Sequence, residues 1–287
     1  MTTPDVHSFF DEATFTVSYL VADPKTGRAA IIDSVLDFDP ASGRTSTRSA
    51  DAVIEAVKAH DYSVEWVLDT HVHADHLSAA NYVRQTLGGK TGIGENVALV
   101  QRQFKSVFNL KTLATDGSQF DKLFADNEAF ALGNIEASVL HTPGHTPGCV
   151  TYVFGDAAFV GDTLFMPDYG TARTDFPGGD AGTLYDAIQR IFSLPDETRL
   201  FMCHDYKAPG RDEFAWETTV KAQRESNIHI NTNIDRDEFI EMRTGRDANL
   251  SMPKLILPSV QVNVCAGALP EPEDNDVRYL KIPLDVF

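Results

Sequence analysis

Alternating and continuous apolar runs along the chain predict a series of short strands. Residues 13–21 alternate between apolar and polar side chains, and after a turn at Asp23–Gly27 residues 29–35 form the expected return strand of a hairpin. Later runs, too short for helices and bounded by turn residues, predict further strands. These runs are residues 64–69, 128–131, 135–140, 149–154, 157–160 and 199–203.

Apolar positions at helical spacing predict helices between the strands. Ser49 is a suitable N-cap for a helix that continues to about His60. The run 255–264 is apolar but contains Pro258, so we expect a strand or an extended segment there. The other expected helices are residues 75–87, 95–110, 180–192, 218–227 and 235–242.

The order of these elements indicates the fold class. Two runs of strands, each followed by a helix, predict an α/β protein in which two sheets lie between helices. We expect one domain over residues 1–287, with a helical and extended segment from about 207 to 287 packed on it. The loop Leu36–Ser46 is too long for a tight connection, so it is either a surface excursion or a rim of the functional site.

Candidate chemistry is concentrated in the stretch directly after the strand at 64–69. His71, His73, Asp75 and His76 lie within six residues, in a chain with nine histidines. Imidazole and carboxylate together are the usual ligands of zinc or non-haem iron. The alternative, a polar loop with incidental histidines, explains this clustering poorly.

Three later positions offer the same kind of ligand. His145 lies between two Pro-Gly turns, Asp162 follows the strand at 157–160, and His204 follows the strand at 199–203. Each alone would be read as a cap or a packed residue. Strand-end loops can aim several side chains at one point, so together they predict a metal site.

Composition and charge mainly exclude other classes of protein. The net charge of −18, with no basic run, argues against a nucleic acid partner, and an anionic substrate would need local cations. Three separated cysteines give no disulfide framework. We see no secretory signal and no apolar run of membrane-spanning length, and therefore expect a cytoplasmic protein without a membrane partner.

The order of these motifs along the chain resembles that of the metallo-β-lactamase superfamily over Phe15–Tyr206. The motifs are His-x-His-x-Asp-His, Pro-Gly-His, Gly-Asp and His. The resemblance implies an αβ/βα sandwich with metal ions at one edge of two mixed β-sheets. In a two-metal arrangement it assigns the ligands in two sets with Asp162 between them. The sets would be His71, His73 and His145, and Asp75, His76 and His204.

Five segments resemble the persulfide dioxygenases, also called sulfur dioxygenases or ETHE1-like proteins, in a bacterial branch. They are His73–His76, His145–Thr151, Ala172–Phe176, Thr183–Tyr185 and His204–Tyr206. This resemblance implies one Fe(II) per chain, oxidation of glutathione persulfide by O₂ to sulfite and glutathione, and a homodimer.

The resemblance places the Fe(II) on His71, His145 and Asp162. Two histidines and one carboxylate are the ligand triad of Fe(II) oxygenases. His73, Asp75, His76 and His204 would then surround the iron site without binding it. Because zinc binds such ligands more tightly than ferrous iron, ligand identity alone leaves the metal open. The alternative is a glyoxalase II-type hydrolase of S-acylglutathione thioesters with two Zn(II).

Substrate contacts follow from the same resemblance. Arg173 is the first choice for a glutathione carboxylate, because a guanidinium can bind a carboxylate through two parallel hydrogen bonds, and Tyr206 is a second contact. The alternatives are an Arg173–Asp175 ion pair and a Tyr206 that only packs. For Cys149 we expect a buried structural thiol rather than a redox role.

Overall fold

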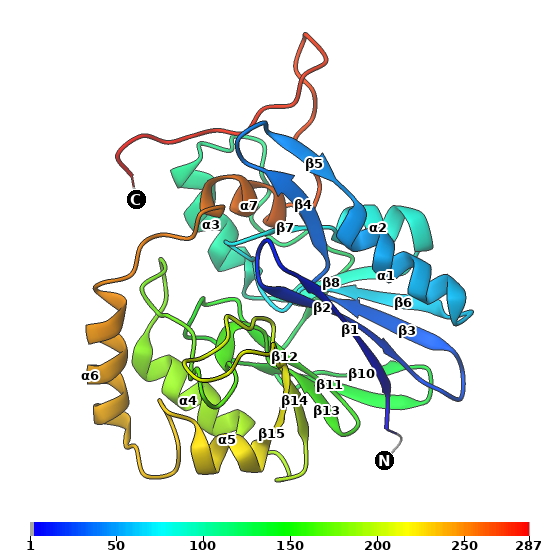
Figure 1. Cartoon of the computed structure of the whole chain (residues 1–287). Coiled ribbons are helices and arrows are strands. Elements are labelled where there is room, and N and C mark those ends of the chain that lie inside the picture. Colours follow the sequence, from blue (N-terminus) through cyan, green and yellow to red (C-terminus); the bar gives the residue numbers. More distant parts are fainter. Residues whose placement is uncertain (1–2, 287) are drawn as a thin grey trace.

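The computed structural model describes residues 3–286, in which two six-stranded sheets face each other (Figure 1). In the first sheet the order is β1-β2-β3-β6-β8-β9, with antiparallel pairing from β1 to β3 and parallel pairing from β3 to β9. Its strands are β1 (Asp5–Asp11), β2 (Thr16–Ala22), β3 (Arg28–Ile32), β6 (Ser63–Leu68), β8 (Lys90–Gly94) and β9 (Lys122–Phe124).

The second sheet follows the order of the chain and is antiparallel except for the parallel pair β13/β14. Its strands are β10 (Ala129–Leu132), β11 (Ile135–His141), β12 (Val150–Phe154), β13 (Ala157–Phe159), β14 (Arg199–Phe201) and β15 (Glu217–Thr219). A small third sheet has the order β5-β4-β7. Its strands are β4 (Val35–Asp39), β5 (Arg44–Ser46) and β7 (Leu77–Ser78).

Helices cover the outer faces of both large sheets, as the α/β sandwich requires. Apolar side chains of α1 and α2 pack on the first sheet, those of α4, α5 and α6 pack on the second, and α3 packs with α7. Within residues 3–286 no helix has the length and apolar character needed to cross a membrane. The helices are α1 (Arg48–Ala59), α2 (Ala80–Leu87), α3 (Val97–Val107), α4 (Ala181–Ile191), α5 (Val220–Ser226), α6 (Arg236–Asp247) and α7 (Ile256–Asn263).

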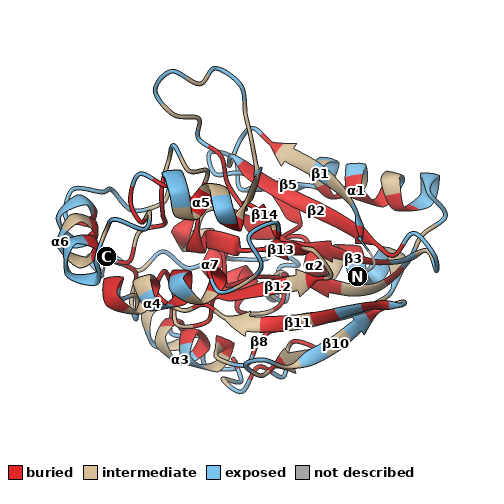
Figure 2. Ribbon diagram, turned by 90° about the horizontal axis from the view of Figure 1, so that it is seen from below, coloured by how far each residue is buried: buried red, intermediate tan, exposed pale blue. Residues whose placement is uncertain are grey.

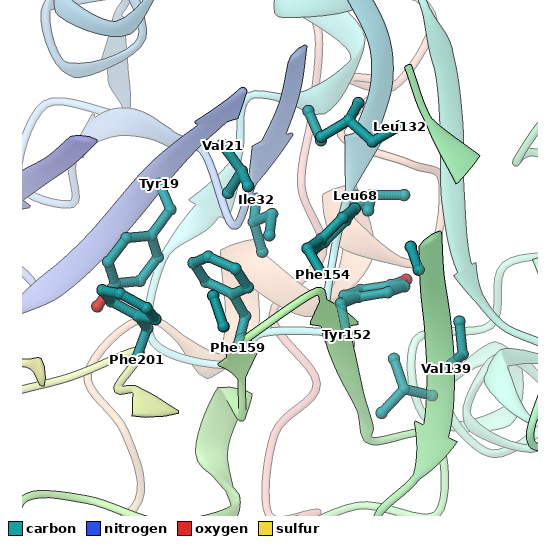
Figure 3. Close-up of a cluster of buried hydrophobic side chains, with 14 of the residues drawn as sticks. Tyr19, Val21, Ile32, Leu68, Leu132, Val139, Tyr152, Phe154, Phe159 and Phe201 are labelled. Atoms are coloured by element: carbon teal, nitrogen blue, oxygen red, sulfur yellow. The ribbon is translucent and has the colours of Figure 1, made fainter. Parts of the chain in front are cut away.

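The main core lies between the two sheets (Figure 3). The Tyr19 ring meets the ring of Phe159 edge-on, with centroids 5.1 Å apart, and full burial of one such side chain contributes about 1.5–3 kcal/mol. Tyr152 donates its hydroxyl proton to the carbonyl of Asp69, two residues before the first predicted ligand. The core is therefore tied directly to the loop that carries the candidate chemistry. Figure 2 shows the same arrangement as buried strands inside partly exposed helices.

Two segments differ from the sequence prediction because of contacts with distant parts of the chain. The stretch 36–46 is the hairpin β4/β5 rather than an irregular loop. The helix expected from Asp75 begins only at Ala80, because Leu77 and Ser78 pair with β4. Neither pairing partner is adjacent in sequence, so local patterns miss both.

Two local predictions were also wrong. Residues 255–264 form helix α7, not a strand. Pro258 lies in its first turn, where a backbone N–H would have no helical partner and proline is tolerated. Strand β1 was missed entirely, although it pairs along its whole length with β2.

Candidate metal centre

All seven predicted ligands lie in connections at strand ends. His71, His73, Asp75 and His76 occupy the loop between β6 and β7, and the remaining three follow β11, β13 and β14. The loop before His145 needs Gly144, whose φ is +139°. A Cβ at Gly144 would lie 2.3 Å from the Cα of Leu184, so the turn packs tightly on α4. The packing of this turn thus fixes the direction from which His145 reaches the other predicted ligands.

The first ligand group consists of His71, His145 and Asp162, whose ligand atoms all lie within 4.8 Å of one another. The Nε2 atoms of His71 and His145 lie 3.9 and 3.7 Å from Oδ2 of Asp162. The Nδ1 of His145 lies 2.8 Å from the backbone oxygen of Arg173. A carbonyl oxygen can only accept, so Nδ1 carries the proton and Nε2 keeps a free lone pair for a metal.

A second group lies directly beside the first. His73, Asp75 and His76 also have ligand atoms within 4.8 Å of one another. The Nε2 of His204 is 3.2 Å from Oδ2 of Asp75 and 3.3 Å from Oδ1 of Asp162. Asp162 therefore lies between the two groups of candidate ligands.

The donor atoms of this cluster fit a bound cation. Buried polar atoms are normally paired, because an unpaired one costs about 1–3 kcal/mol. Of the nine buried side-chain atoms that have no hydrogen-bond partner within the described residues, six belong to predicted ligands. They are His71 Nε2, His73 Nδ1, Asp75 Oδ2, His76 Nε2, Asp162 Oδ1 and His204 Nε2. Metal coordination would satisfy these nitrogen and carboxylate atoms together.

Asp33 supports the ligand loop and was missed by the sequence prediction. Its carboxylate accepts from the backbone N–H of Thr70 (2.7 Å), the Thr70 hydroxyl (2.9 Å) and His73 Nε2 (2.9 Å). Although burial opposes protonation of the imidazole, Asp33 raises the pKa of His73 to about 9. A carboxylate directly after buried strand β3 was the available signal, but the predicted strand ran through it to residue 35.

Asn263, at the end of α7, also holds the ligand loop. Its amide donates to the backbone oxygens of His73 and His76, both at 2.8 Å, and accepts from the N–H of Ser78 at 2.7 Å. The side chain is buried and all three contacts are far away in sequence. No local pattern could have identified it.

A cavity of about 540 Å³ leads to the ligand groups. Asp75, His145 and Asp162 are among its lining residues, and six aromatic side chains contribute to its walls. Phe38 and Pro40 of the β4/β5 hairpin also line it, so this segment forms a rim of the site. The aromatic lining residues are Phe15, Phe38, Phe165, Tyr169, Phe176 and Tyr206.

The predicted substrate residues both line this cavity. Tyr206 is partly exposed and stacks on His204, with ring centroids 5.6 Å apart and planes at 17°. Arg173 donates to both oxygens of Asp175, at 2.6 and 2.5 Å, and to the backbone oxygen of Ser251. The guanidinium is thus already paired, while the Arg173 carbonyl orients His145.

Cys149 fits the structural interpretation. It is 2 % exposed, and its sulfur lies 3.1 Å from the hydroxyl oxygen of Thr146. Burial raises the pKa of this thiol to about 12, so the reactive thiolate is disfavoured.

His229, another wall residue, should make stability depend on pH. Its Nδ1 accepts from the Thr171 N–H at 3.0 Å, and a Cβ at Gly170 would lie 2.1 Å from that nitrogen. Burial, then the charges of Arg243 and Arg246, lower its pKa to about 4. The unfolded state therefore binds a proton that the folded state rejects, and this contribution to stability is lost as pH falls from about 6.5 to 4.

The test is His229→Asn, whose side-chain oxygen can still accept from Thr171. With chelator present throughout, the free energy of unfolding of the wild type should fall more steeply between pH 6.5 and 4 than that of the variant. Equal slopes in denaturant titrations would contradict the assignment.

Comparison with known proteins identifies relatives of the whole chain. The model of the Metallo-beta-lactamase superfamily matches residues 11–204. A probable metallo-hydrolase of Burkholderia pseudomallei is 56% identical over 98% of this chain and 99% of its own length. Glyoxylase B2 of Dictyostelium discoideum is 50% identical over 94% of this chain and 93% of its own length. A beta-lactamase hydrolase-like protein of Agrobacterium fabrum is 54% identical over 99% of this chain, which spans only 65% of that relative.

Among solved structures, ETHE1 from Myxococcus xanthus has the same fold. It is 31% identical, with a TM-score of 0.74, and the match covers 92% of this chain and 100% of that protein. The matched family region ends at His204, so α5, α6 and α7 lie outside it.

Proposed function

Because the chain belongs to the metallo-beta-lactamase superfamily, we propose that it is a metal-dependent enzyme and, specifically, a persulfide dioxygenase with one Fe(II) per chain. The observation that carries this proposal is the buried group of His71, His145 and Asp162, of which His145 and Asp162 line the cavity. Two histidines and one carboxylate leave positions open for substrate and O₂ on iron. The similarity to ETHE1 from Myxococcus xanthus supports the same function.

A ferrous ion held by these three residues would supply the oxygen chemistry, and the protein would supply orientation and exclusion of water. The Arg173 carbonyl keeps the Nε2 of His145 directed at the ion site. His204 Nε2 can hold a proton between Asp75 and Asp162, which keeps these carboxylates in place. Aromatic side chains that line the cavity, Phe165 and Phe176 among them, would limit the access of water to the terminal sulfur of bound glutathione persulfide.

A specific observation also supports the second candidate, a dinuclear-zinc hydrolase of S-acylglutathione thioesters. The second ligand group, His73, Asp75 and His76, has unpaired donor atoms of its own. With both groups filled, two Zn(II) could activate a water between them. The relatives described as a probable metallo-hydrolase and Glyoxylase B2 are consistent with this alternative.

Metal analysis with two activity assays separates these candidates. Protein purified without added metal should contain about one iron per chain and consume O₂ with glutathione persulfide, releasing sulfite. Two zinc ions per chain, thioester hydrolysis and no O₂ uptake would refute the dioxygenase and support the hydrolase. Zinc-reconstituted protein serves as the control for oxygen chemistry, because zinc has no redox activity.

A further inference from the structure

Two cations at the cavity have no partner. Four basic side chains line it, of which Arg173 is paired with Asp175 and Arg243 with Asp247. Across residues 3–286, neither Arg246 nor Lys254 has a side-chain hydrogen bond or ion pair with another described residue. In a chain with 42 acidic and 24 basic residues, two free cations on one cavity are unexpected.

The distribution of charge along the cavity is uneven. Its only acidic lining residues, within the described chain, are Asp75 and Asp162, and both belong to the ligand groups. Arg246 and Lys254 are exposed to solvent, so they lie at the open part of the cavity. A substrate bound with its reactive sulfur at the metal would therefore place its outer part among positive charges.

Arg246 is held in position by buried contacts of α6. Asp235 and Glu238 form a capping box at the start of the helix. Near its end, Asp247 binds buried Arg243 and accepts from the backbone N–H and hydroxyl of Thr174, next to Arg173. The last turn of α6 is thus fixed to the cavity wall, and Arg246 does not depend on a flexible tail for its placement.

We propose that Arg246 and Lys254 bind carboxylate groups of the thiol carrier. The enzyme would then select sulfur substrates of carboxylate-bearing thiols, of which a tripeptide thiol is one, over those of small neutral thiols. The sulfur chemistry rests on the proposed function, but recognition of the carrier does not. Charge-assisted hydrogen bonds from both cations would overcome the repulsion that a net charge of −18 exerts on an anion.

Binding of S-methylglutathione, which cannot react, tests the proposal without catalysis. Calorimetry on metal-loaded protein should show about tenfold weaker binding for Arg246→Met and for Lys254→Met, a larger loss for the double variant, and reduced salt dependence. Lys58→Met, on α1, is the matched control and should bind as the wild type does. In kinetics, the ratio of kcat/KM for glutathione persulfide to that for 2-hydroxyethyl persulfide should fall about tenfold.

The possible outcomes distinguish the carboxylate site from the dioxygenase activity. Unchanged binding and selectivity in the double variant, or no binding of S-methylglutathione to the wild type, would overturn the carboxylate site. Cation-dependent binding in a protein that consumes no O₂ would support the site while refuting the dioxygenase.

Discussion

Asp162→Ala should abolish metal binding and lower turnover about a thousandfold or more, equivalent to about 4 kcal/mol of transition-state stabilisation. Asp162 supplies the carboxylate of the first ligand group and contacts His204 of the second. Its Oδ1 makes no hydrogen bond within the described residues, but the carboxylate lies 3.3 to 3.9 Å from ring nitrogens of His71, His145 and His204. Elemental analysis should show loss of the metal, and the thermal midpoint of chelated protein reports separately on what these contacts contribute to the metal-free fold.

Asp156→Ala provides the comparison, because Asp156 lies in the turn between β12 and β13 and pairs with Arg199 away from the ligands. It should keep both metal and activity. Retention of metal and turnover in Asp162→Ala would refute the assignment of the triad.

Asp33→Ala should cost about 3–5 kcal/mol of unfolding free energy and weaken metal binding about 10- to 100-fold. The substitution leaves buried donors of Thr70 and His73 without an acceptor. It also puts alanine at a φ of +52°, where a Cβ is strained but aspartate and asparagine are better tolerated. Denaturant titration of chelated protein gives the first value, and competition with a metal indicator gives the second.

Two further variants test whether Asp33 orients the predicted ligands or only stabilises the fold. Asp33→Asn keeps the backbone preference and an acceptor oxygen, and should recover most of the stability. Asp23→Ala removes another buried carboxylate, which binds Thr26 and the Asn134 N–H, and should destabilise without changing the affinity for metal. If Asp23→Ala lowers metal affinity as much as Asp33→Ala, the role of Asp33 is only structural.

Metal chemistry restricts residue type and spacing more strongly than packing does, so the sequence could single out candidate ligands that the structure brings close together. His71, His145 and Asp162 each follow a strand, and strand ends can be predicted from apolar runs. The fold class followed from the same runs. The choice between zinc and iron, in contrast, cannot be predicted from the identity of the ligands, because both metals bind the same donor atoms.

What sequence patterns missed depends on contacts between distant residues. Asn263 acts on a loop 187–190 positions earlier, and β7 exists only because β4 lies beside it. Arg246 and Arg173 are both arginines near the site. Only the structure shows that Arg173 is paired with Asp175, whereas Arg246 has no ion pair with any residue that the structure describes. Local propensity cannot predict such pairing, since it is decided by tertiary packing.

The contacts of Asn263 connect the candidate metal site to a part of the chain that lies outside the matched family region. All seven predicted ligands precede Tyr206, so a chain that ended there would contain the complete set of predicted ligands. It would lack the side-chain amide of Asn263, which donates to the backbone carbonyls of His73 and His76. The loop that carries both histidines would lose these two hydrogen bonds. The segment that follows the family match at His204 therefore helps to hold the candidate metal centre through Asn263, and swapping this segment between relatives would exchange more than a surface region.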